Sequence, residues 1–289
     1  MIRRPSRSAG FSWRLPTFAL LAILALTCAV PADAQRRDRR DDRDRDRRNT
    51  PEWTVDPAFQ NDVFSFARLR YESWGGSWGG WGGWGGGRGR WATDAPDADL
   101  NLMFRLQQMT ALKVNPEVTY IDIEPEQLRH YPFVYMVEPG RLMFRDEEVT
   151  ALRDYLLNGG FIMLDDFWGE EDWDNVRREF ARVFPDRDPV ELEIDHPIFH
   201  IIFDLDEKPQ MPGIDFYMRG GRSDERNSGP PHYWAYYDDK GRMMAIFCHN
   251  TDLGDGWERE GEDPTYFRRF AEKMAYPMAI NIIYYAMTH

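Results

Sequence analysis

The sequence predicts an α/β domain with a mostly parallel sheet and helices on both of its faces. Strand and helix patterns alternate between residues 63 and 184, as they do in domains built from successive strand–helix units. One predicted strand, Phe161–Leu164, is wholly apolar, which is typical of a strand buried on both sides in a parallel sheet. A single cysteine, Cys248, follows residues 1–34, so packing and not a disulfide must stabilise the core.

Four strands and three helices are predicted in the first half of this domain. The first helix has apolar residues at helical spacing, and Asp97 is its expected N-cap because a carboxylate accepts hydrogen bonds from free backbone N–H groups. The second helix has acids in its first turn and ends before Gly159-Gly160. In chain order the ranges are strand 63–67, helix 97–110, strands 118–123 and 133–137, helix 146–157, strand 161–164 and helix 172–184.

The later part of the chain is predicted to hold a β-hairpin insertion and a closing helix. Segments 233–237 and 243–247 flank Asp238-Asp239-Lys240-Gly241, a typical turn sequence between two strands. From 266 to 288 the pattern is that of an amphipathic helix interrupted at Pro277. Its apolar second half is too short to span a bilayer, so we expect a helix in the core.

The N-terminus has the three parts of a cleavable export signal. A basic region with four arginines precedes an apolar run over 18–30, and Ala32-Asp33-Ala34 forms a small-residue cleavage site. The apolar run is shorter than the roughly 20 residues that a spanning helix needs. We therefore expect cleavage near Ala34, an exported chain that is periplasmic or extracellular, and no transmembrane span in the mature chain.

Charge divides the remaining sequence into a linker and one domain. Residues 35–58 begin with an Arg/Asp-rich tract that lacks apolar residues, which is typical of a disordered linker. Residues 59–289 are sufficient for a single α/β domain with a full core. The chain has a formal net charge of −13, and removal of residues 1–34 makes it more negative because that segment is basic. An acidic domain of this kind is not expected to bind nucleic acid or an anionic lipid surface.

A second biased stretch, residues 73–91, alternates tryptophan with glycine. Glycine loses much backbone entropy on ordering, so the stretch is predicted to be a loop inside the domain. Tryptophan rings on such a loop can stack on sugar rings, close over a ligand or lie at a membrane interface. The alternative is an insertion whose rings cover a nearby apolar patch.

Six ordered segments of the chain read ATDAPDADLN, YPFVYMVEPG, LRDYLLNGGFIMLDD, HPIFHIIFDL, HNTDLGDGWE and NIIYYAMT. Together they resemble a known bacterial family, the domain of unknown function 4159, over roughly residues 60–288. The resemblance implies a flavodoxin-like fold, similar to class I glutamine amidotransferases and trehalose-utilisation-like proteins. The Trp/Gly-rich insertion at 74–89 departs from the family pattern, so nothing is carried over to that loop.

The catalytic feature of amidotransferases is missing at the matching position. Their cysteine nucleophile lies on a tight, glycine-flanked turn between a strand and a helix. This chain has Asp165 and Asp166 there, while Cys248 lies in a predicted strand without flanking glycines. We therefore expect a buried structural thiol and no glutamine hydrolysis.

Asp165 and Asp166 are the first candidate site residues. They end a predicted parallel strand, and ligands of open α/β sheets bind at that carboxyl edge. Such a carboxylate can bind a divalent cation, act as a general base or accept hydrogen bonds from sugar hydroxyls, and Trp168 is near enough to line the same site. Alternatively one aspartate caps the next helix, since Glu170–Asp172 complement its dipole.

Histidine pairs are the second candidate. His196 and His200 have the spacing that brings two imidazoles together on a helix for zinc binding, and His196 is a candidate catalytic partner of the aspartates. However, Pro197 and the β-rich residues after it favour a turn and a strand, where this spacing separates the rings. Structural capping of a loop is the alternative.

The turn-rich segment after the hairpin is the third candidate. His249, Asp252, Asp255 and Glu258 are candidate ligand-binding residues, because acidic loops supply hard oxygen ligands to Ca²⁺. The alternative is a turn held by hydrogen bonds from Asp and Asn side chains to the backbone. Arg222 is a candidate anion-binding residue whose alternative is pairing with a local acid.

These observations favour a non-catalytic exported domain that binds a ligand, such as a saccharide, or that serves as a scaffold for an envelope protein. No cofactor is required by the sequence, although a divalent cation is a candidate. The alternative is a hydrolase that uses Asp165 or Asp166 with a histidine, in a metal-assisted form or without metal. Convergence of these residues at the carboxyl edge of the sheet would favour the enzyme.

Overall fold

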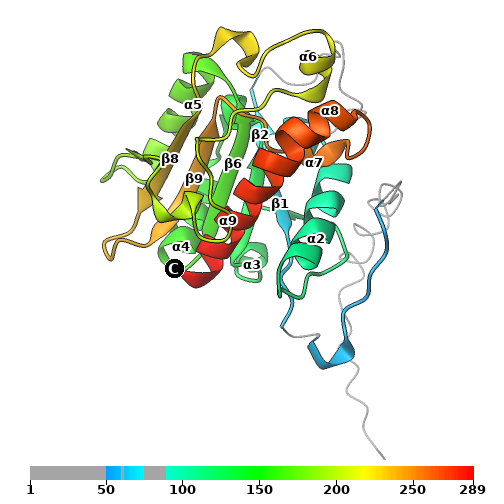
Figure 1. Ribbon diagram of the computed structural model, residues 1–289. Coiled ribbons are helices and arrows are strands. Elements are labelled where there is room, and N and C mark those ends of the chain that lie inside the picture. The colour runs from blue at the N-terminus through cyan, green and yellow to red at the C-terminus, as the bar shows by residue number, and fades with distance from the viewer. Residues whose placement is uncertain (1–49, 60–61, 75–88) are drawn as a thin grey trace, which may run out of the picture. The chain divides into compact units, whose positions relative to one another are not determined.

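A seven-stranded sheet forms the centre of the computed structural model, which describes residues 50–59, 62–74 and 89–289 (Figure 1). Its strands lie in the order β3 (Thr119–Asp122), β1 (Ala67–Arg70), β4 (Phe133–Val137), β6 (Phe161–Phe167), β9 (Met243–His249), β8 (His232–Tyr237) and β7 (Val190–Glu191). The first five are parallel, whereas β8 is antiparallel to both of its neighbours. The predicted α/β fold with a mostly parallel sheet is confirmed.

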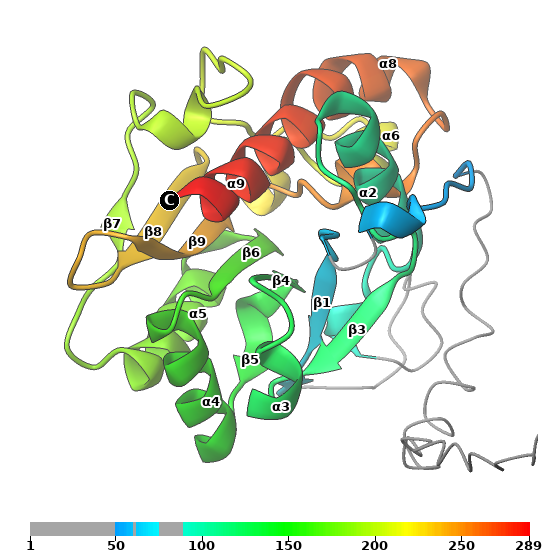
Figure 2. The same ribbon diagram turned by 90° about the horizontal axis from the view of Figure 1, so that it is seen from below.

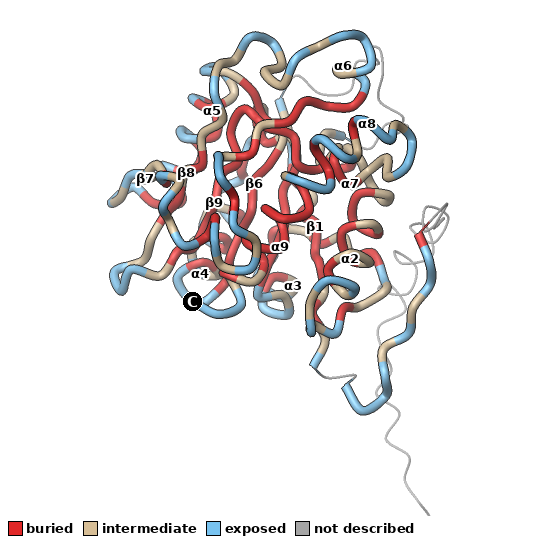
Figure 3. Tube along the Cα trace, in the orientation of Figure 1, coloured by how far each residue is buried: buried red, intermediate tan, exposed pale blue. Residues whose placement is uncertain are grey.

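Helices cover both faces of the sheet, as Figure 2 shows. Helices α2 (Asp97–Met109) and α9 (Tyr276–Thr288) pack on one face, while α4 (Asp146–Leu157) and α5 (Gly169–Val183) pack on the other. Strand β4 is buried along its whole length because its alternate side chains enter the two hydrophobic cores in turn. In Figure 3 the central strands are buried, and exposure is concentrated in the connections.

Short elements complete the fold. A two-stranded antiparallel sheet joins β2 (Glu72–Ser73) to β5 (Leu142–Met143). The remaining elements are η2 (Pro57–Phe59), η3 (Arg90–Ala92), α3 (Pro125–Leu128), η4 (Pro139–Arg141), η5 (Pro197–Phe199), α6 (Ile214–Met218), η6 (Glu225–Asn227), α7 (Asp255–Glu258), α8 (Pro264–Tyr266) and η7 (Phe267–Ala275). Among the described residues, none of the helices has the length and apolarity that a bilayer span requires.

Three predicted elements differ from the observed ones in an informative way. The strand expected over 63–67 begins at Ala67 instead, and Phe64 forms only an isolated bridge with Val114. The expected hairpin is not an insertion, because its second strand pairs in parallel with β6 and is the fifth parallel strand of the sheet. The closing helix is continuous through Pro277, which lies in the first turn of α9 directly after the π-helical segment η7.

The N-terminal expectations fall largely outside the described residues, which begin at Thr50. The export signal at 1–34 and the core of the Trp/Gly-rich loop, residues 75–88, are not described. Trp53, placed in the linker by the sequence, packs on Phe104 of α2 with ring centroids 5.7 Å apart. Its indole Nε1 also donates to the Val114 carbonyl at 2.8 Å. Ordered packing of the chain therefore begins upstream of the expected boundary at residue 59.

Candidate functional site

Acidic side chains from three separate parts of the chain meet at the carboxyl edge of the sheet. We call them the carboxyl-edge cluster: Asp94 before α2, Asp165 and Asp166 at the end of β6, and Asp252, Asp255 and Glu258 after β9. Burial is the largest cause that raises the pKa of each of the five aspartates, and the charges of neighbouring acids raise most of them further. Five of these six residues were predicted as candidates, two at a strand end and three in an acidic loop, and the structure brings both sets together.

Asp165 is the member of the cluster that has a structural role. It is fully buried, and its carboxylate accepts hydrogen bonds from the backbone N–H groups of Gly254 (2.8 Å) and Leu253 (3.3 Å) and from the Tyr135 hydroxyl (3.2 Å). Burial raises the pKa of Asp165 to about 7, against these hydrogen bonds, which lower it. Asp165 thus fixes the loop after β9 onto the end of β6.

Asp166 lies at a break in the sheet. The pairing of β6 with β9 shifts register between Leu164 and Phe167, and Asp166 adopts a left-handed backbone conformation with φ 56°. A non-glycine residue in this conformation stores backbone strain, which is concentrated at functional sites. Its Oδ1 accepts a hydrogen bond from the indole Nε1 of Trp168 at 2.9 Å. Because Trp168 is buried, its ring orients Asp166 and is not free to stack on a ligand.

The segment after β9 is a turn held by side chains, and it also delivers acids to the cluster. Asn250, with φ 60°, accepts from Gly169 N at 2.8 Å and donates to the carbonyls of Ser228 and Pro230. Asp252 accepts from Asp255 N at 2.9 Å, and Asp255 accepts from Ile214 N at 2.6 Å. The structure therefore shows the turn held by side chains, which was the alternative, while the role of these acids as cation ligands stays a prediction.

Asp94 was missed by the sequence analysis. Its backbone is left-handed (φ 64°), and the chain before it is fixed by Arg68, whose guanidinium donates to the carbonyls of Thr93 (2.6 Å) and Trp91 (3.2 Å). Arg68 is itself held in a fully buried ion pair with Asp99 of α2 at 2.9 Å. Asp94 is in the connection that follows the parallel strand β1, but the Trp/Gly-rich stretch separates the two in sequence and hides the relation.

Two glycines allow the acids to approach one another. A Cβ atom on Gly254 would lie 2.9 Å from Asp94 Oδ2 and 3.0 Å from the Tyr135 hydroxyl. A Cβ atom on Gly213 would lie 2.7 Å from Asp255 Oδ2 and 3.0 Å from Glu225 Oε1. At these distances the facing side chains would have to shift, so a larger residue at either position would disturb the present arrangement of the carboxylates.

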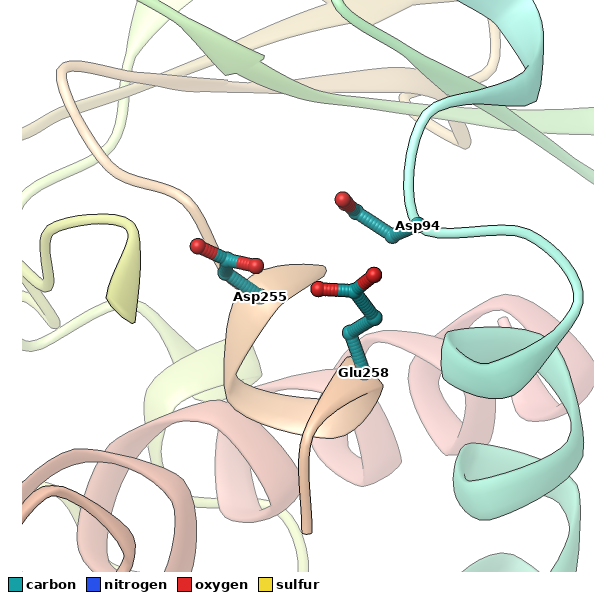
Figure 4. Close-up of side chains that lie close together, drawn as sticks. All are labelled: Asp94, Asp255 and Glu258. Carbon is teal, nitrogen blue, oxygen red and sulfur yellow. The ribbon is translucent and has the colours of Figure 1, made fainter. Parts of the chain in front are cut away.

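Three members of the cluster have the spacing of metal ligands. One carboxylate oxygen each of Asp94, Asp255 and Glu258 lies within 4.8 Å of the other two, and Figure 4 shows the three groups facing one another. Oxygen ligands of this kind suit hard cations such as Ca²⁺ and Mg²⁺. The charge of Glu258 is the second cause, after burial, that raises the pKa of Asp255.

The predicted histidines do not join this cluster. His249 is buried on the face of the sheet that α5 covers, stacked on Phe167 and Trp173 with ring centroids at 5.0 and 5.5 Å. Its Nε2 is hydrogen-bonded to the Gly169 carbonyl, and burial lowers its pKa to about 4, so the ring is neutral near pH 7. Asp165, in contrast, contacts Tyr135 on the opposite face.

His196 and His200 point to different partners. His196 caps the short helix η5, where its Nδ1 accepts from Ile198 N, and its Nε2 is hydrogen-bonded to the Tyr237 hydroxyl at 3.2 Å. His200 is bonded through its two nitrogens to Asp204 and the Ile194 carbonyl. This is the capping role that the sequence offered as the alternative to zinc binding.

The remaining candidates lie apart from the cluster. Arg222 is exposed and pairs with Asp224 at 3.4 Å, which is the local pairing expected as its alternative. Cys248 is buried in β9, and burial raises the pKa of its thiol, which disfavours the reactive thiolate.

These features define the class of protein: an α/β domain with an acid-rich carboxyl edge on a mostly parallel sheet. The family described as "Domain of unknown function (DUF4159)" matches residues 65–287, which is most of the chain, and the chain belongs to that family. The family resemblance found in six segments is thereby confirmed. No curated protein matches the chain.

Proposed function

We propose that this chain is an exported binding domain of the cell envelope, whose ligand is held at the carboxyl-edge cluster. The observation that carries the proposal is the convergence of acids from three chain segments, with pKa values raised by burial and by one another. Burying like charges together costs free energy, and natural domains keep such costly arrangements mainly where a ligand uses them. The export signal in the sequence supports a location outside the cytoplasm.

The strand order supports a flavodoxin-like assignment for the fold. If the parallel strands are numbered along the chain, the order β3-β1-β4-β6-β9 reads 2-1-3-4-5, which is the flavodoxin-like order. Folds of this kind bind ligands beyond the carboxyl ends of their strands, where the cluster lies. The same order is compatible with the proposed similarity to class I glutamine amidotransferases, although the nucleophile position holds Asp166.

A saccharide is the ligand that we favour, because carboxylates accept hydrogen bonds from several sugar hydroxyls at once. The test is a thermal-shift screen of the purified chain against glycans and cell-wall fragments, followed by titration of each hit. Asp166→Asn should weaken binding of a hit at least tenfold, whereas Asp174→Asn, on the exposed side of α5, should leave it unchanged. A screen without any hit would exclude the saccharide, and equal binding by both variants would exclude the site.

A second candidate is a hydrolase centred on Asp166, favoured by one specific observation. Asp166 combines a left-handed backbone with a position between a strand and a helix, which is the geometry that exposes nucleophiles in α/β hydrolases. The histidine partners considered from the sequence give no support, since His249 and His196 contact other groups. Incubation of a binding hit with the chain discriminates the two: cleavage that Asp166→Asn abolishes favours the enzyme, and an intact ligand favours the binding domain.

A further inference from the structure

We infer that Asp94, Asp255 and Glu258 form a binding site for a hard divalent cation, Ca²⁺ or Mg²⁺. One oxygen of each lies within 4.8 Å of the others, and the three carboxylates are turned toward a common space (Figure 4). Two oxygens bound to one ion at roughly 2.0–2.6 Å are at most about 4–5 Å apart. The observed spacing is therefore one that a single shared ion can satisfy.

A second observation is independent of the clustering: within the described part of the chain, Asp94 Oδ2 has no hydrogen-bond partner. This oxygen is buried, and Figure 4 shows the carboxyl group of Asp94 extending into the space beside Asp255 and Glu258. Arg68, whose charge lowers the pKa of Asp94, directs its hydrogen bonds to Asp99 and to the Trp91 and Thr93 carbonyls, and none to Asp94. A buried carboxylate oxygen without a donor is costly, and a bound cation removes that cost.

Asp255 and Glu258 each use one carboxylate oxygen in a hydrogen bond within the protein. Asp255 Oδ2 accepts from Ile214 N at 2.6 Å, and the carboxyl group also lies at hydrogen-bond distance from the Glu258 carboxyl, a contact that a bound ion would replace. Glu258 Oε2 accepts from Arg259 Nε at 3.0 Å, which leaves Oε1. Arg259 also pairs with Asp215 at 2.8 Å, so its single positive charge is shared and does not neutralise the cluster.

The two segments that carry the ligands are fixed to each other without the ion. Asn101 of α2 donates through Nδ2 to the carbonyls of Trp257 (2.7 Å) and Glu258 (3.2 Å). Asp94 is tied to α2 by the bond from Ala98 N to its own carbonyl at 2.9 Å. The site is thus held in place before an ion enters, which reduces the cost of ordering ligands on binding.

The chemistry of the ligands selects the class of ion. All three offer carboxylate oxygen, whereas soft or borderline ions such as Zn²⁺ favour nitrogen and sulfur ligands. The histidines and the cysteine near the ends of β8 and β9 are directed elsewhere. This inference deepens the proposed function and rests on it only for the use of the ion, which would bridge the cluster to a ligand's hydroxyl or carboxylate oxygens.

The test is calorimetric titration of CaCl₂ and of MgCl₂ into the purified chain after chelator treatment. We expect one bound ion per chain for at least one of the two salts, and a melting temperature raised by about 5–10 °C at a hundredfold excess over Kd. Asp94→Asn should reduce the affinity at least tenfold, while Asp174→Asn on α5 should bind as the parent does. In chelator, Asp94→Asn should melt no lower than the parent because it removes like-charge repulsion.

Two results overturn the inference. One is the absence of binding for both salts in the folded parent at millimolar concentration. The other is equal affinity of the parent and Asp94→Asn. Failure of the inference can be told from failure of the proposed function. If a saccharide binds in the presence of chelator, and only Asp166→Asn abolishes that binding, the proposed function stands and the cation site is excluded. If an ion binds while the glycan screen has no hit, the cation site stands and the saccharide is excluded as the ligand.

Discussion

The two faces of the sheet bury different kinds of polar group at its carboxyl end. On the face of α2 and α9, Asp165, Asp94 and Asp252 are enclosed acids that repel one another. On the face of α5, His249 is enclosed as a neutral ring in a stack with Phe167 and Trp173. Similar sequence signals, a polar residue at the end of a buried strand, thus lead to a charged cluster on one side and an aromatic layer on the other.

This difference between the two faces indicates which of them holds the candidate ligand-binding site. On the aromatic side His249 is held by stacking and by the bond of its Nε2 to the Gly169 carbonyl, and burial favours the neutral form of the ring. Among the described residues, both sides hold buried atoms without a hydrogen-bond partner, Asp94 Oδ2 on one and His249 Nδ1 on the other, but only the acidic side also brings several carboxylates together, so we expect its arrangement to serve more than the fold. Substitutions on both sides, and one away from them, test this contrast.

The largest effect is expected from Arg68→Met, on the acidic side. The substitution leaves Asp99 buried without its cation and frees the Thr93 carbonyl, so the free energy of unfolding should fall by about 3–5 kcal/mol. Urea unfolding at pH 7 measures the loss. The double variant Arg68→Met/Asp99→Leu removes both charges and should regain much of it. A double variant as unstable as the sum of its single changes would show that the pair is not coupled.

Asp165→Asn should show that Asp165 stabilises the folded chain more at acid pH than at neutral pH. Burial raises the pKa of Asp165 to about 7 from an unfolded value near 3.8, so the folded chain binds the extra proton. The corresponding stability is fully present below about pH 4 and is lost as pH rises through 7, a change of about 3–5 kcal/mol. The variant's stability relative to the parent, measured in chelator, should therefore be lowest at pH 4 and rise toward pH 8. A difference that is constant with pH would contradict the assignment.

His249→Phe, on the aromatic side, should show a pH dependence of stability with the opposite sign. Burial lowers the pKa of His249 to about 4, so the unfolded chain binds the proton first as pH falls below about 6.5. In the parent, this stability is fully present above pH 6.5, and about 3 kcal/mol is lost by pH 4. Phenylalanine keeps the stack and cannot be protonated, so the variant should gain on the parent between pH 6.5 and 4. If both proteins follow the same pH profile in urea unfolding, His249 does not titrate as assigned.

Sequence reasoning predicted the layers of the fold better than the membership of the site. The helix at 146–157 and the strand at 133–137 were predicted with their observed bounds, because apolar spacing and turn residues are local signals. Strand β6 was expected to end at Leu164, since the aspartates after it break the apolar run, although its pairing continues to Phe167.

The site depends on contacts that no local pattern contains. Asp252, Asp255 and Glu258 were proposed as cation ligands from their turn-rich setting, and two of them are in the observed trio. Asp94 completes the trio only because Arg68 and Asp99 fix its loop, and that ion pair spans 31 residues of sequence. His249 was grouped with the acids because it is near them along the chain, whereas the pleat of β9 directs it to the other face.

The smallest effect is expected from Arg222→Ala, which tests whether charge far from both faces matters. The Arg222 side chain is 80% exposed, and its one ion pair with a described residue is that with Asp224 at 3.4 Å. Exposed pairs of this kind contribute little, so the free energy of unfolding should change by less than about 0.5 kcal/mol. Binding of a glycan hit or of a cation at the cluster should also be unchanged. A tenfold loss of ligand affinity in this folded variant would instead extend the site to the loop before η6 and restore the anion-binding role that the sequence suggested for Arg222.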